Sequence, residues 1–568
     1  MVAMNRCRCS IAVAMAVAAL QGTLGAVGAA SAASPVDDYV YTIRAGDTVI
    51  GLSQRLLKAP EAWREVAKYN RLPNPNRVRP SQQVRITLEL LRDAATSATL
   101  ASVDGDVKVS TGASGATTAA APSVAALGAS LAEGAEVVTG KNGYATLKLA
   151  DGSTVRVQAG SQVQVNRLRS YPDAGILESV ISVISGRVES LITKFSKDSA
   201  TQPRHSVTTR YATMGVRGTQ FRVTMDAQAN ETRSEVLEGA VAANAEGAAG
   251  DGKRIAAGFG TVVDASKTVA DPIALLGAPE TGKLPGLLER TLLRFPLPAV
   301  AGAKAYRAQI ARDKEFNSIV SDTVSPSAEL RFTDVPDGTY VLRVRAIDPR
   351  GLEGRDATHE FRLKARPEPP LVSAPPTKGK VRSKEVEFKW TDNPEAATYH
   401  LQVASDTGFK SLVHENKAAK GTTAVVANLA LGNYFWRVAS IRKDGDRGPN
   451  GDEVSFALLA PPAQPEPPKV GDDAIQFRWA GEPGQKFEFQ LADNAQFAKP
   501  LLTRTLDNPE IEVPRPSPGT YFMRFRATDP DGFVGPFSSV QRFSMPACLT
   551  DSLGRCVSSG FGIIGPSQ

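Results

Sequence analysis

The feature that most constrains this fold is the alternation of apolar and polar residues between glycine turns. It is densest from Gly186 to Val241, where Phe221, Val223 and Met225 alternate with polar residues. A period of two places one set of side chains on the buried face of a strand, and glycine permits the tight turns between strands. The pattern predicts β-structure, and no side chain in this stretch is arranged for catalysis.

Two short motifs in this stretch resemble the FecR domain: GVRGTQF at residues 215–221 and VLEG at residues 236–239. Short valine-rich segments with glycine turns precede them, so the resemblance extends over residues 99–266. It implies an all-β domain of stacked short strands. A structural turn is favoured over a ligand site here, and its signature residues are Gly215, Val216, Arg217, Gly218, Thr219 and Phe221.

Length and charge bound the remaining possibilities. A chain of 568 residues is too long for one hydrophobic core and predicts about three to five domains. The formal net charge of +7 is small for this length. Spread over several domains, it does not indicate a nucleic-acid partner, although it suits an anionic cell-wall surface.

The first 33 residues are predicted to be a signal peptide. Two arginines, an alanine-rich apolar stretch and small residues at positions 30–33 follow one another as in secretory leaders. A retained membrane anchor is the alternative. After residue 35 no apolar run approaches the length of about 18 residues that spans a bilayer. We therefore expect export to the periplasm or cell envelope.

The chain contains four cysteines, and two of them, Cys7 and Cys9, would leave with the leader. The remaining pair, Cys548 and Cys556, lies in the C-terminal tail at residues 547–568. An oxidising compartment would close this pair into a small disulfide loop. Two sulfurs without a nearby histidine do not suit a metal site, and no cofactor is expected.

Residues 39–91 predict a small βααβ module. A short strand ending near Ile43 meets a turn in which Asp47 or Thr48 can cap a helix. A second helix is predicted from Pro60, because proline suits the first helical turn. Alternating Val84 and Ile86 predict the closing strand.

This module resembles a LysM module, a family that binds N-acetylglucosamine-containing glycans such as peptidoglycan. The matching residues are YTI at 41–43, GDT at 46–48, Trp63 and Asn70, whereas Ser81 replaces the usual turn glycine. The resemblance implies a glycan-binding groove lined by Gly46, Asp47, Thr48, Val49, Leu72, Pro73 and Asn74. Asp47 and Thr48 can also serve only as helix caps. Between Tyr41 and Leu91, nine Lys and Arg against four Asp and Glu give a net charge of +5.

A threefold repeat occupies the rest of the chain, after a predicted linker at residues 267–288. Gly-x-Tyr triplets recur at residues 338–340, 432–434 and 519–521, each followed by an alternating apolar pattern. The repeats predict tandem β-sandwiches that resemble fibronectin type III modules. Their predicted bounds are residues 289–365, 377–460 and 468–546. Their aromatic residues are predicted to form cores rather than binding sites.

Three hypotheses about function follow. The first is a non-enzymatic, mainly β envelope protein that binds peptidoglycan and presents its β-domains to a protein partner. The second is a signalling component acting through an envelope or inner-membrane protein, as the FecR resemblance implies. The third is a peptidoglycan hydrolase. It is disfavoured because the four histidines form no His-Glu-x-x-His pair and no serine lies in a convincing nucleophile motif.

Overall fold

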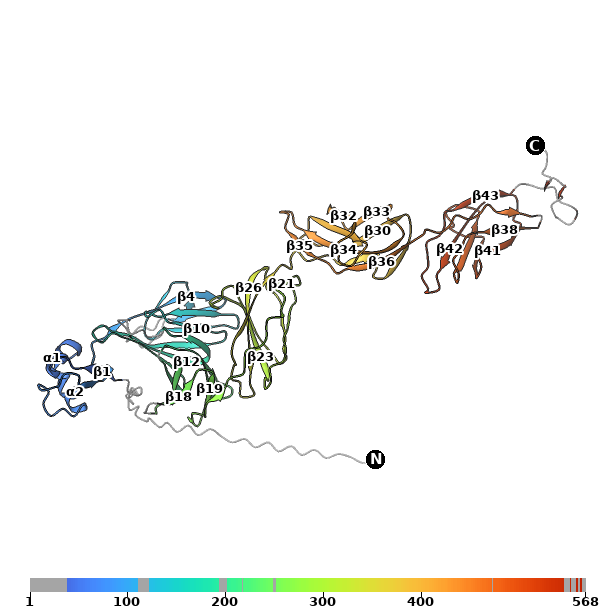
Figure 1. The fold of residues 1–568 in the computed structure, drawn as a ribbon. Helices are drawn as coiled ribbons and strands as arrows, with labels where there is room; N and C mark the ends of the chain where they lie inside the picture. The colour runs from blue at the N-terminus through green and yellow to red at the C-terminus, as the bar shows by residue number, and fades with distance from the viewer. Residues whose placement is uncertain are drawn as a thin grey trace, which may run out of the picture. The chain divides into compact units, whose positions relative to one another are not determined.

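The computed structural model describes residues 38–110, 122–193, 202–216, 218–248, 252–471 and 473–545, with residues 552, 558–559 and 562–563 of the tail. Residues 1–33, Arg217, Cys548 and Cys556 lie outside the described residues, so the predicted leader and disulfide stay predictions. The chain divides into two compact units: unit 1, residues 1–275, and unit 2, residues 276–568. Both consist mainly of strands, which confirms the predicted fold class (Figure 1). In the part of the chain that is described, no helix is long and apolar enough to cross a bilayer.

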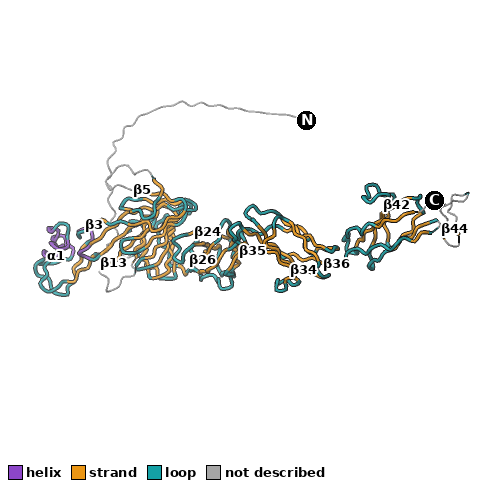
Figure 2. The backbone as a smooth tube through the Cα atoms, turned by 90° about the horizontal axis from the view of Figure 1, so that it is seen from above, coloured by secondary structure: helices purple, strands orange, loops and turns teal. Residues whose placement is uncertain are grey.

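Unit 1 begins with the expected βααβ module, where the α-helices of the described chain are found (Figure 2). Its elements are β1 (Tyr39–Thr42), α1 (Val49–Leu56), the 3₁₀ turn η1 (Pro60–Ala62), α2 (Trp63–Tyr69), β2 (Gln83–Ile86) and a second 3₁₀ turn η2 (Leu88–Leu90). β1 and β2 pair antiparallel, with Tyr41 opposite Val84. Thr48 caps α1, because its hydroxyl accepts a hydrogen bond from the Gly51 N–H at 3.0 Å.

The core of this module continues into the β-domain that follows it. Leu52, Leu56 and Val66 pack in one cluster with Tyr171 and Ile176. Tyr171 and Ile176 belong to the next domain and flank the 3₁₀ turn η3 (Pro172–Ala174). Polar contacts reinforce the junction, since Asp93 lies 2.7 Å from Lys58 and 3.2 Å from Arg169. The module is therefore an integral part of unit 1 rather than a separately folded domain.

Strands β3 to β20 close into a barrel made of two sheets. The first sheet contains β3 (Ala94–Ala95), β5 (Val107–Ser110), β6 (Ser123–Val124), β8 (Glu136–Thr139), β11 (Gln162–Tyr171), β13 (Gln202–Thr208), β14 (Ala212–Val216), β17 (Ala240–Ala245) and β18 (Lys253–Ala256). The second sheet contains β4 (Ala98–Asp104), β7 (Ser130–Leu131), β9 (Tyr144–Lys148), β10 (Thr154–Val157), β15 (Gln220–Asp226), β16 (Glu231–Glu238), β19 (Phe259–Asp264) and β20 (Ile273–Ala274). The alternating apolar residues of both sheets, among them Val188, Met214 and Phe221, fill the core between them.

One long strand, β12 (Ile176–Leu191), belongs to both sheets. Its first part pairs with β11 and β13, and its last part pairs with β10 and β15. The change occurs at Gly186, which has φ +85°, a conformation that suits glycine. A Cβ at this position would lie 2.5 Å from Cα of Ser161, so the crossing leaves no room for a side chain.

Unit 2 consists of three sandwiches. The first contains β21 (Leu287–Leu288), β22 (Leu293–Pro296), β23 (Ala305–Ala311), β24 (Ile319–Ser325), β25 (Glu329–Phe332), β26 (Gly338–Ile347) and β27 (Ala357–Leu363). The second contains β28 (Val372–Ala374), β29 (Gly379–Arg382), β30 (Glu385–Trp390), β31 (Thr398–Ala404), β32 (Leu412–Ala419), β33 (Thr423–Ala427), β34 (Gly432–Ile441), β35 (Arg447–Asn450) and β36 (Val454–Leu459). The third contains β37 (Lys469–Val470), β38 (Ala474–Arg478), β39 (Lys486–Ala492), β40 (Leu502–Leu506), β41 (Glu510–Pro514), β42 (Gly519–Thr528) and β43 (Gln541–Met545), and a short tail hairpin follows it, β44 (Ser558–Ser559) with β45 (Gly562–Ile563).

The predicted linker at residues 267–288 contributes a strand to each unit. β20 pairs with β19 in unit 1, and β21 pairs with β27 in unit 2. Short hydrogen-bonded strands at both ends leave little of this segment as a free connection.

The repeated motifs occupy the same place in all three sandwiches. The hydroxyls of Tyr340, Tyr434 and Tyr521 each donate to the carbonyl four residues earlier, at 2.6 to 2.8 Å. This is the tyrosine corner of immunoglobulin-like sandwiches. In each sandwich an arginine also covers a phenylalanine ring at about 4 Å, in the pairs Arg343–Phe316, Arg437–Phe409 and Arg524–Phe497. The predicted core aromatics Phe295, Trp390 and Trp479 are buried.

Candidate functional site

The two loops predicted to line the glycan groove lie against each other in the βααβ module. One loop joins β1 to α1, and the other joins α2 to β2. The backbone N–H of Val49 donates to the carbonyl of Pro75 at 3.0 Å. The structure thus brings the segment Gly46–Val49 beside the segment Leu72–Pro75, although 22 or more residues separate them in the chain.

Asp47 holds the first loop together. Its carboxylate accepts hydrogen bonds from the Arg44 N–H at 2.8 Å and from the Tyr41 hydroxyl at 2.9 Å. Arg55 lies 3.8 Å from the same side chain. The backbone hydrogen bond from Arg44 holds the pKa of Asp47 below its usual range. Asp47 therefore has a structural role in the turn, whatever it contributes to a ligand.

The other residues of this loop differ in what they expose. Gly46 is exposed and Thr48 is half-buried with its hydroxyl occupied by the cap. Val49 is only 1% exposed and packs in the module core. Its side chain therefore lies away from the surface, because the first turn of α1 directs it inward. The first loop presents mainly backbone at the predicted groove.

The second loop presents an apolar surface with one polar side chain. Leu72 is half-buried, and Pro73 and Asn74 are exposed. The Asn74 side-chain oxygen accepts from the Asn76 N–H at 2.9 Å, and the Asn74 carbonyl accepts from the Arg77 N–H at 3.2 Å. These bonds fix the loop in one conformation and leave the Asn74 amide NH₂ as a donor. Such a mixture of apolar surface and a few oriented polar groups is suited to sugar rings.

Asn70 has a structural role that the sequence pattern did not reveal. Its side-chain amide donates to the carbonyls of Val66 and Arg85 and accepts from the Arg85 N–H. The end of α2 is thereby fixed to β2, which positions the second loop. An asparagine directly after a helix was the available signal, but its partner lies fifteen residues further along the chain.

The FecR signature residues build a crossing between the two sheets. Val216 ends β14 in one sheet, and Phe221 lies in β15 of the other, with Gly218 at φ +63° between them. The carbonyl of Thr219 accepts from the Ile192 N–H at 2.9 Å, next to the end of β12. Phe221 is fully buried in the core.

The two FecR motifs meet at this crossing. A Cβ on Gly239 would lie 2.5 Å from Cγ2 of Thr219, so the glycine of the second motif makes room for the threonine of the first. By contrast, a Cβ on Gly215 would meet no atom of the described residues within 4 Å, and nothing in the structure explains this glycine. The contacts of Gly239 and Thr219 favour the structural interpretation of the signature over a ligand site.

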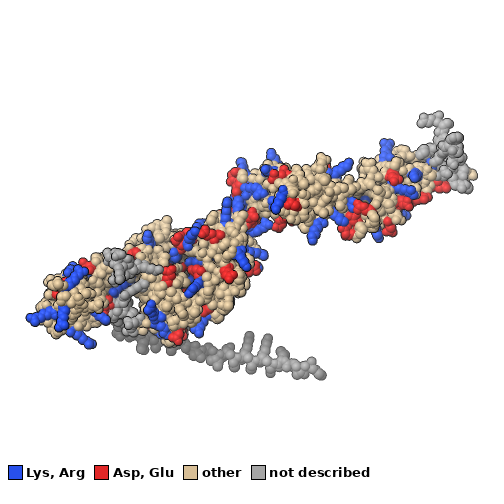
Figure 3. Space-filling view, viewed as in Figure 1, with Lys and Arg blue, Asp and Glu red and all other residues tan. Residues whose placement is uncertain are grey.

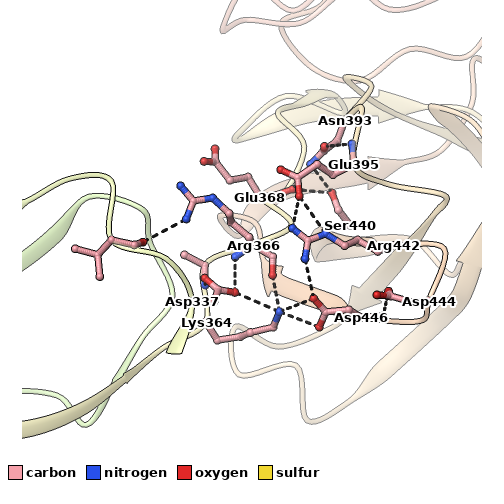
Figure 4. Close-up of polar contacts among 12 residues, drawn as sticks. Asp337, Lys364, Arg366, Glu368, Asn393, Glu395, Ser440, Arg442, Asp444 and Asp446 are labelled. Atoms are coloured by element: carbon pink, nitrogen blue, oxygen red, sulfur yellow. Dashed lines mark hydrogen bonds and ion pairs between the residues drawn. The ribbon is translucent and has the colours of Figure 1, made fainter. Parts of the chain in front are cut away.

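A network of polar contacts joins the first two sandwiches of unit 2 (Figure 4). Lys364, just after β27, donates to Asp337 of its own sandwich at 3.3 Å and to Asp446 of the next at 2.9 Å. The Glu368 carbonyl accepts from Ser440 at 2.7 Å and from Asn393 at 2.6 Å. The segment between the sandwiches is thus bonded to the second sandwich at Lys364 and Glu368.

A second network joins sandwiches two and three. Arg382 at the end of β29 donates to Glu482 at 2.9 and 3.0 Å and to Asp529 at 3.2 Å. Lys380 adds a contact to Asp529 at 3.1 Å. The hydrogen bonds from Arg382 hold the pKa of Glu482 below its usual range. A cavity of about 180 Å³ lies beside this network, lined partly by Pro461, Pro462 and Phe525.

Among the described residues, no group of three or more His, Cys, Asp or Glu side chains is placed to hold a metal ion. His205 is fully buried beside Ser179, with the Nδ1 to Oγ distance at 2.8 Å, and burial lowers its pKa to about 3.

Comparison with known proteins identifies one part of the chain. Residues 135–242 match the family described as FecR protein. A search of curated proteins finds no match. Among solved structures, the chain resembles a candidate anti-sigma factor from Parabacteroides distasonis, with 17% identity, a TM-score of 0.19 and coverage of 24% of this chain and 59% of the other.

Two further likenesses are to structures with fibronectin-type domains. The FN1–FN3 domains of chicken CNTN1 match with 14% identity and a TM-score of 0.20, over 48% of this chain and 98% of the other. The fibronectin(III)-like modules of Clostridium thermocellum CbhA match with 14% identity and a TM-score of 0.19, over 31% of this chain and 93% of the other. The family match lies inside the region in which the sequence predicts this domain, and residues 135–242 of this chain therefore form a FecR domain.

Proposed function

We propose that this protein binds N-acetylglucosamine-containing glycan, with peptidoglycan as its ligand, through the groove between residues 46–48 and 72–74. The Val49 to Pro75 hydrogen bond carries the proposal, because it places backbone of the first loop beside the exposed surface of Pro73 and Asn74. Backbone groups and the Asn74 amide can bond acetamido groups, and Leu72 and Pro73 can pack against a sugar face.

In this proposal the protein is a non-enzymatic component of the cell envelope. The βααβ module holds the wall, and the FecR domain and the three sandwiches serve protein interaction. The shared core between the module and the FecR domain supports this division, because a load on the module reaches the β-domain through Tyr171 and Ile176.

The test uses the full-length chain, since the module shares its core with the FecR domain. The protein is incubated with insoluble peptidoglycan, and the pelleted fraction is measured for the wild type, Pro73→Ala and Asn74→Ala. We expect the wild type to pellet and each variant to pellet less, by about three- to tenfold in affinity, the loss of one hydrogen bond or apolar contact.

Gln54→Ala is the matched control. Gln54 is exposed in the last turn of α1, where its carbonyl accepts from Arg92 at the end of the helix remote from Thr48. This variant is expected to pellet like the wild type. Equal recovery of wild type with and without wall would reject the proposal, and release of soluble muropeptides would support the hydrolase instead.

A FecR-type signalling role is the second candidate, favoured by the family match at residues 135–242. In this case the β-domains act through an envelope or inner-membrane protein. Replacing the native protein by a chain whose FecR core is disrupted, with the groove residues intact, would change a defined set of transcripts. An unchanged transcript profile, with wall binding retained, would leave only the anchoring role.

A further inference from the structure

Exposed arginines flank both loops of the proposed groove. Arg44 lies in the first loop, with its N–H on Asp47 and its carbonyl accepting from the Asp47 N–H. Arg71 and Arg77 stand on either side of Leu72–Asn76, and the Arg77 N–H donates to the Asn74 carbonyl. All three side chains are exposed. We call Arg44, Arg71 and Arg77 the arginine rim.

The side chains of the rim form no ion pair among the described residues, although Asp47 lies in the same loop as Arg44. In the described part of the chain, the ion pairs of this module involve Arg55 with Asp47 and Lys58 with Asp93. Figure 3 shows Lys and Arg side chains gathered on the end of unit 1 that carries the module. A guanidinium group offers a planar pair of donors that fits a carboxylate.

We propose that the arginine rim forms an anionic subsite beside the groove and takes the carboxylates of peptide stems attached to the glycan strand. This inference rests on the proposed glycan binding and adds selectivity to it. A strand of N-acetylglucosamine alone is neutral, whereas peptidoglycan carries free stem carboxylates next to its sugars. The rim therefore distinguishes peptidoglycan from chitin, although both fit the same groove.

The charge of the rim makes this selectivity salt-dependent. Its arginines are exposed, and the screening length shrinks from about 10 Å at 0.1 M salt to about 3 Å at 1 M. We expect affinity for peptidoglycan to fall as salt rises, and affinity for a neutral chitin hexamer to stay nearly constant.

The experiment compares two double variants of the full-length chain. Arg44→Gln/Arg77→Gln removes two rim charges, and Arg64→Gln/Arg85→Gln removes two exposed charges from α2 and β2 of the same module. Both lower the net charge of the module by two, so a difference between them reports position rather than total charge. Thermal unfolding of each variant establishes that the fold is kept.

Three glycan ligands are used: peptidoglycan, peptidoglycan whose carboxylates have been converted to amides, and the chitin hexamer. Phosphatidylglycerol vesicles are a fourth probe, which tests for membrane binding. We expect the rim variant to bind peptidoglycan about tenfold more weakly than the wild type, as for the loss of charge-assisted hydrogen bonds. On amidated wall and on chitin hexamer it should bind within about twofold of the wild type. The Arg64/Arg85 variant should bind all three ligands like the wild type.

Other outcomes overturn the inference in recognisable ways. Equal weakening by both double variants would mean non-specific attraction, and unchanged wall binding by the rim variant would remove the subsite. Loss of binding to phosphatidylglycerol vesicles in the rim variant, with wall binding unchanged, would assign the rim to a membrane surface. If the wild type binds neither wall nor chitin hexamer, the proposed function itself fails; if it binds both alike at every salt concentration, only the rim fails.

Discussion

Single residues show where local sequence rules held and where they did not. Of the two cap candidates that the sequence offers, Asp47 and Thr48, the structure shows Thr48 capping α1 through the Gly51 N–H. Val49 was expected at the groove and lies in the core instead. Whether the Val49 side chain faces the groove or the core depends on which side of α1 packs inward. The loop motif alone does not specify that side. Asn70, by contrast, binds backbone of Arg85, which only the folded module brings near.

Gly186 is expected to be the most sensitive glycine of the strand crossing. Gly186 has φ +85°, a conformation that strains any residue with a side chain, and the Cβ of Gly186→Ala would also meet the backbone of Ser161. Strain and overpacking together should lower the unfolding free energy of this domain by more than about 2 kcal/mol. Gly160→Ala, at φ +66° with open space around it, should cost about 1 kcal/mol. Denaturant unfolding of both variants measures the two losses of unfolding free energy. Equal losses would mean that the backbone moves so that the new Cβ no longer contacts Ser161.

His205 should make the FecR domain less stable in mild acid. Its folded-state pKa is lowered to about 3, so the unfolded chain binds the extra proton between pH 6.5 and pH 3. Stability from the neutral, buried imidazole is complete above pH 6.5 and is lost as pH falls. Between pH 7 and pH 5 the loss should approach about 2 kcal/mol. Thermal unfolding of wild type and His205→Gln checks this, and parallel pH profiles would contradict it.

At the scale of elements, the repeated motifs predicted the three sandwiches most directly. Each Gly-x-Tyr triplet lies at the start of a long strand, β26, β34 or β42, and each tyrosine forms the same corner. Alternation and repetition could therefore predict the sandwiches. The double role of β12 could not be predicted, because its partner strands in the second sheet, β10 and β15, are distant in the chain and only Gly186 marks the switch.

The tyrosine corner should be worth the same in each sandwich. Tyr340→Phe, Tyr434→Phe and Tyr521→Phe each remove one hydrogen bond to a carbonyl four residues earlier and keep the buried ring. Each is expected to lower the stability of its own sandwich by about 1 kcal/mol. Denaturant unfolding of the three variants checks this, and a sandwich without any loss would show that water replaces the hydroxyl there.

At the scale of the whole molecule, the contacts between neighbouring modules could not be predicted from the sequence. The pairing of Lys364 with Asp446, or of Arg382 with Asp529, depends on which loops meet across a joint. The core shared by the βααβ module, Tyr171 and Ile176 is equally non-local. No sequence pattern indicated that ion pairs hold these joints.

Arg382 is expected to stiffen the joint between sandwiches two and three. Arg382→Met keeps a similar length and removes the bonds to Glu482 and Asp529. The distance between spin labels placed on the two sandwiches should then become more broadly distributed. Arg478→Met is the control, since Arg478 pairs with Glu510 on the surface of sandwich three. Equal distributions for all three proteins would show that the joint is held by other contacts.

Hydrogen exchange of the full-length chain, with and without a chitin hexamer, tests the central claim most directly. Exchange should slow at residues 44–49 and 71–77, where the two loops lie together, and stay unchanged in the three sandwiches. Protection confined to other segments, or no protection at saturating hexamer, would contradict glycan binding at this groove.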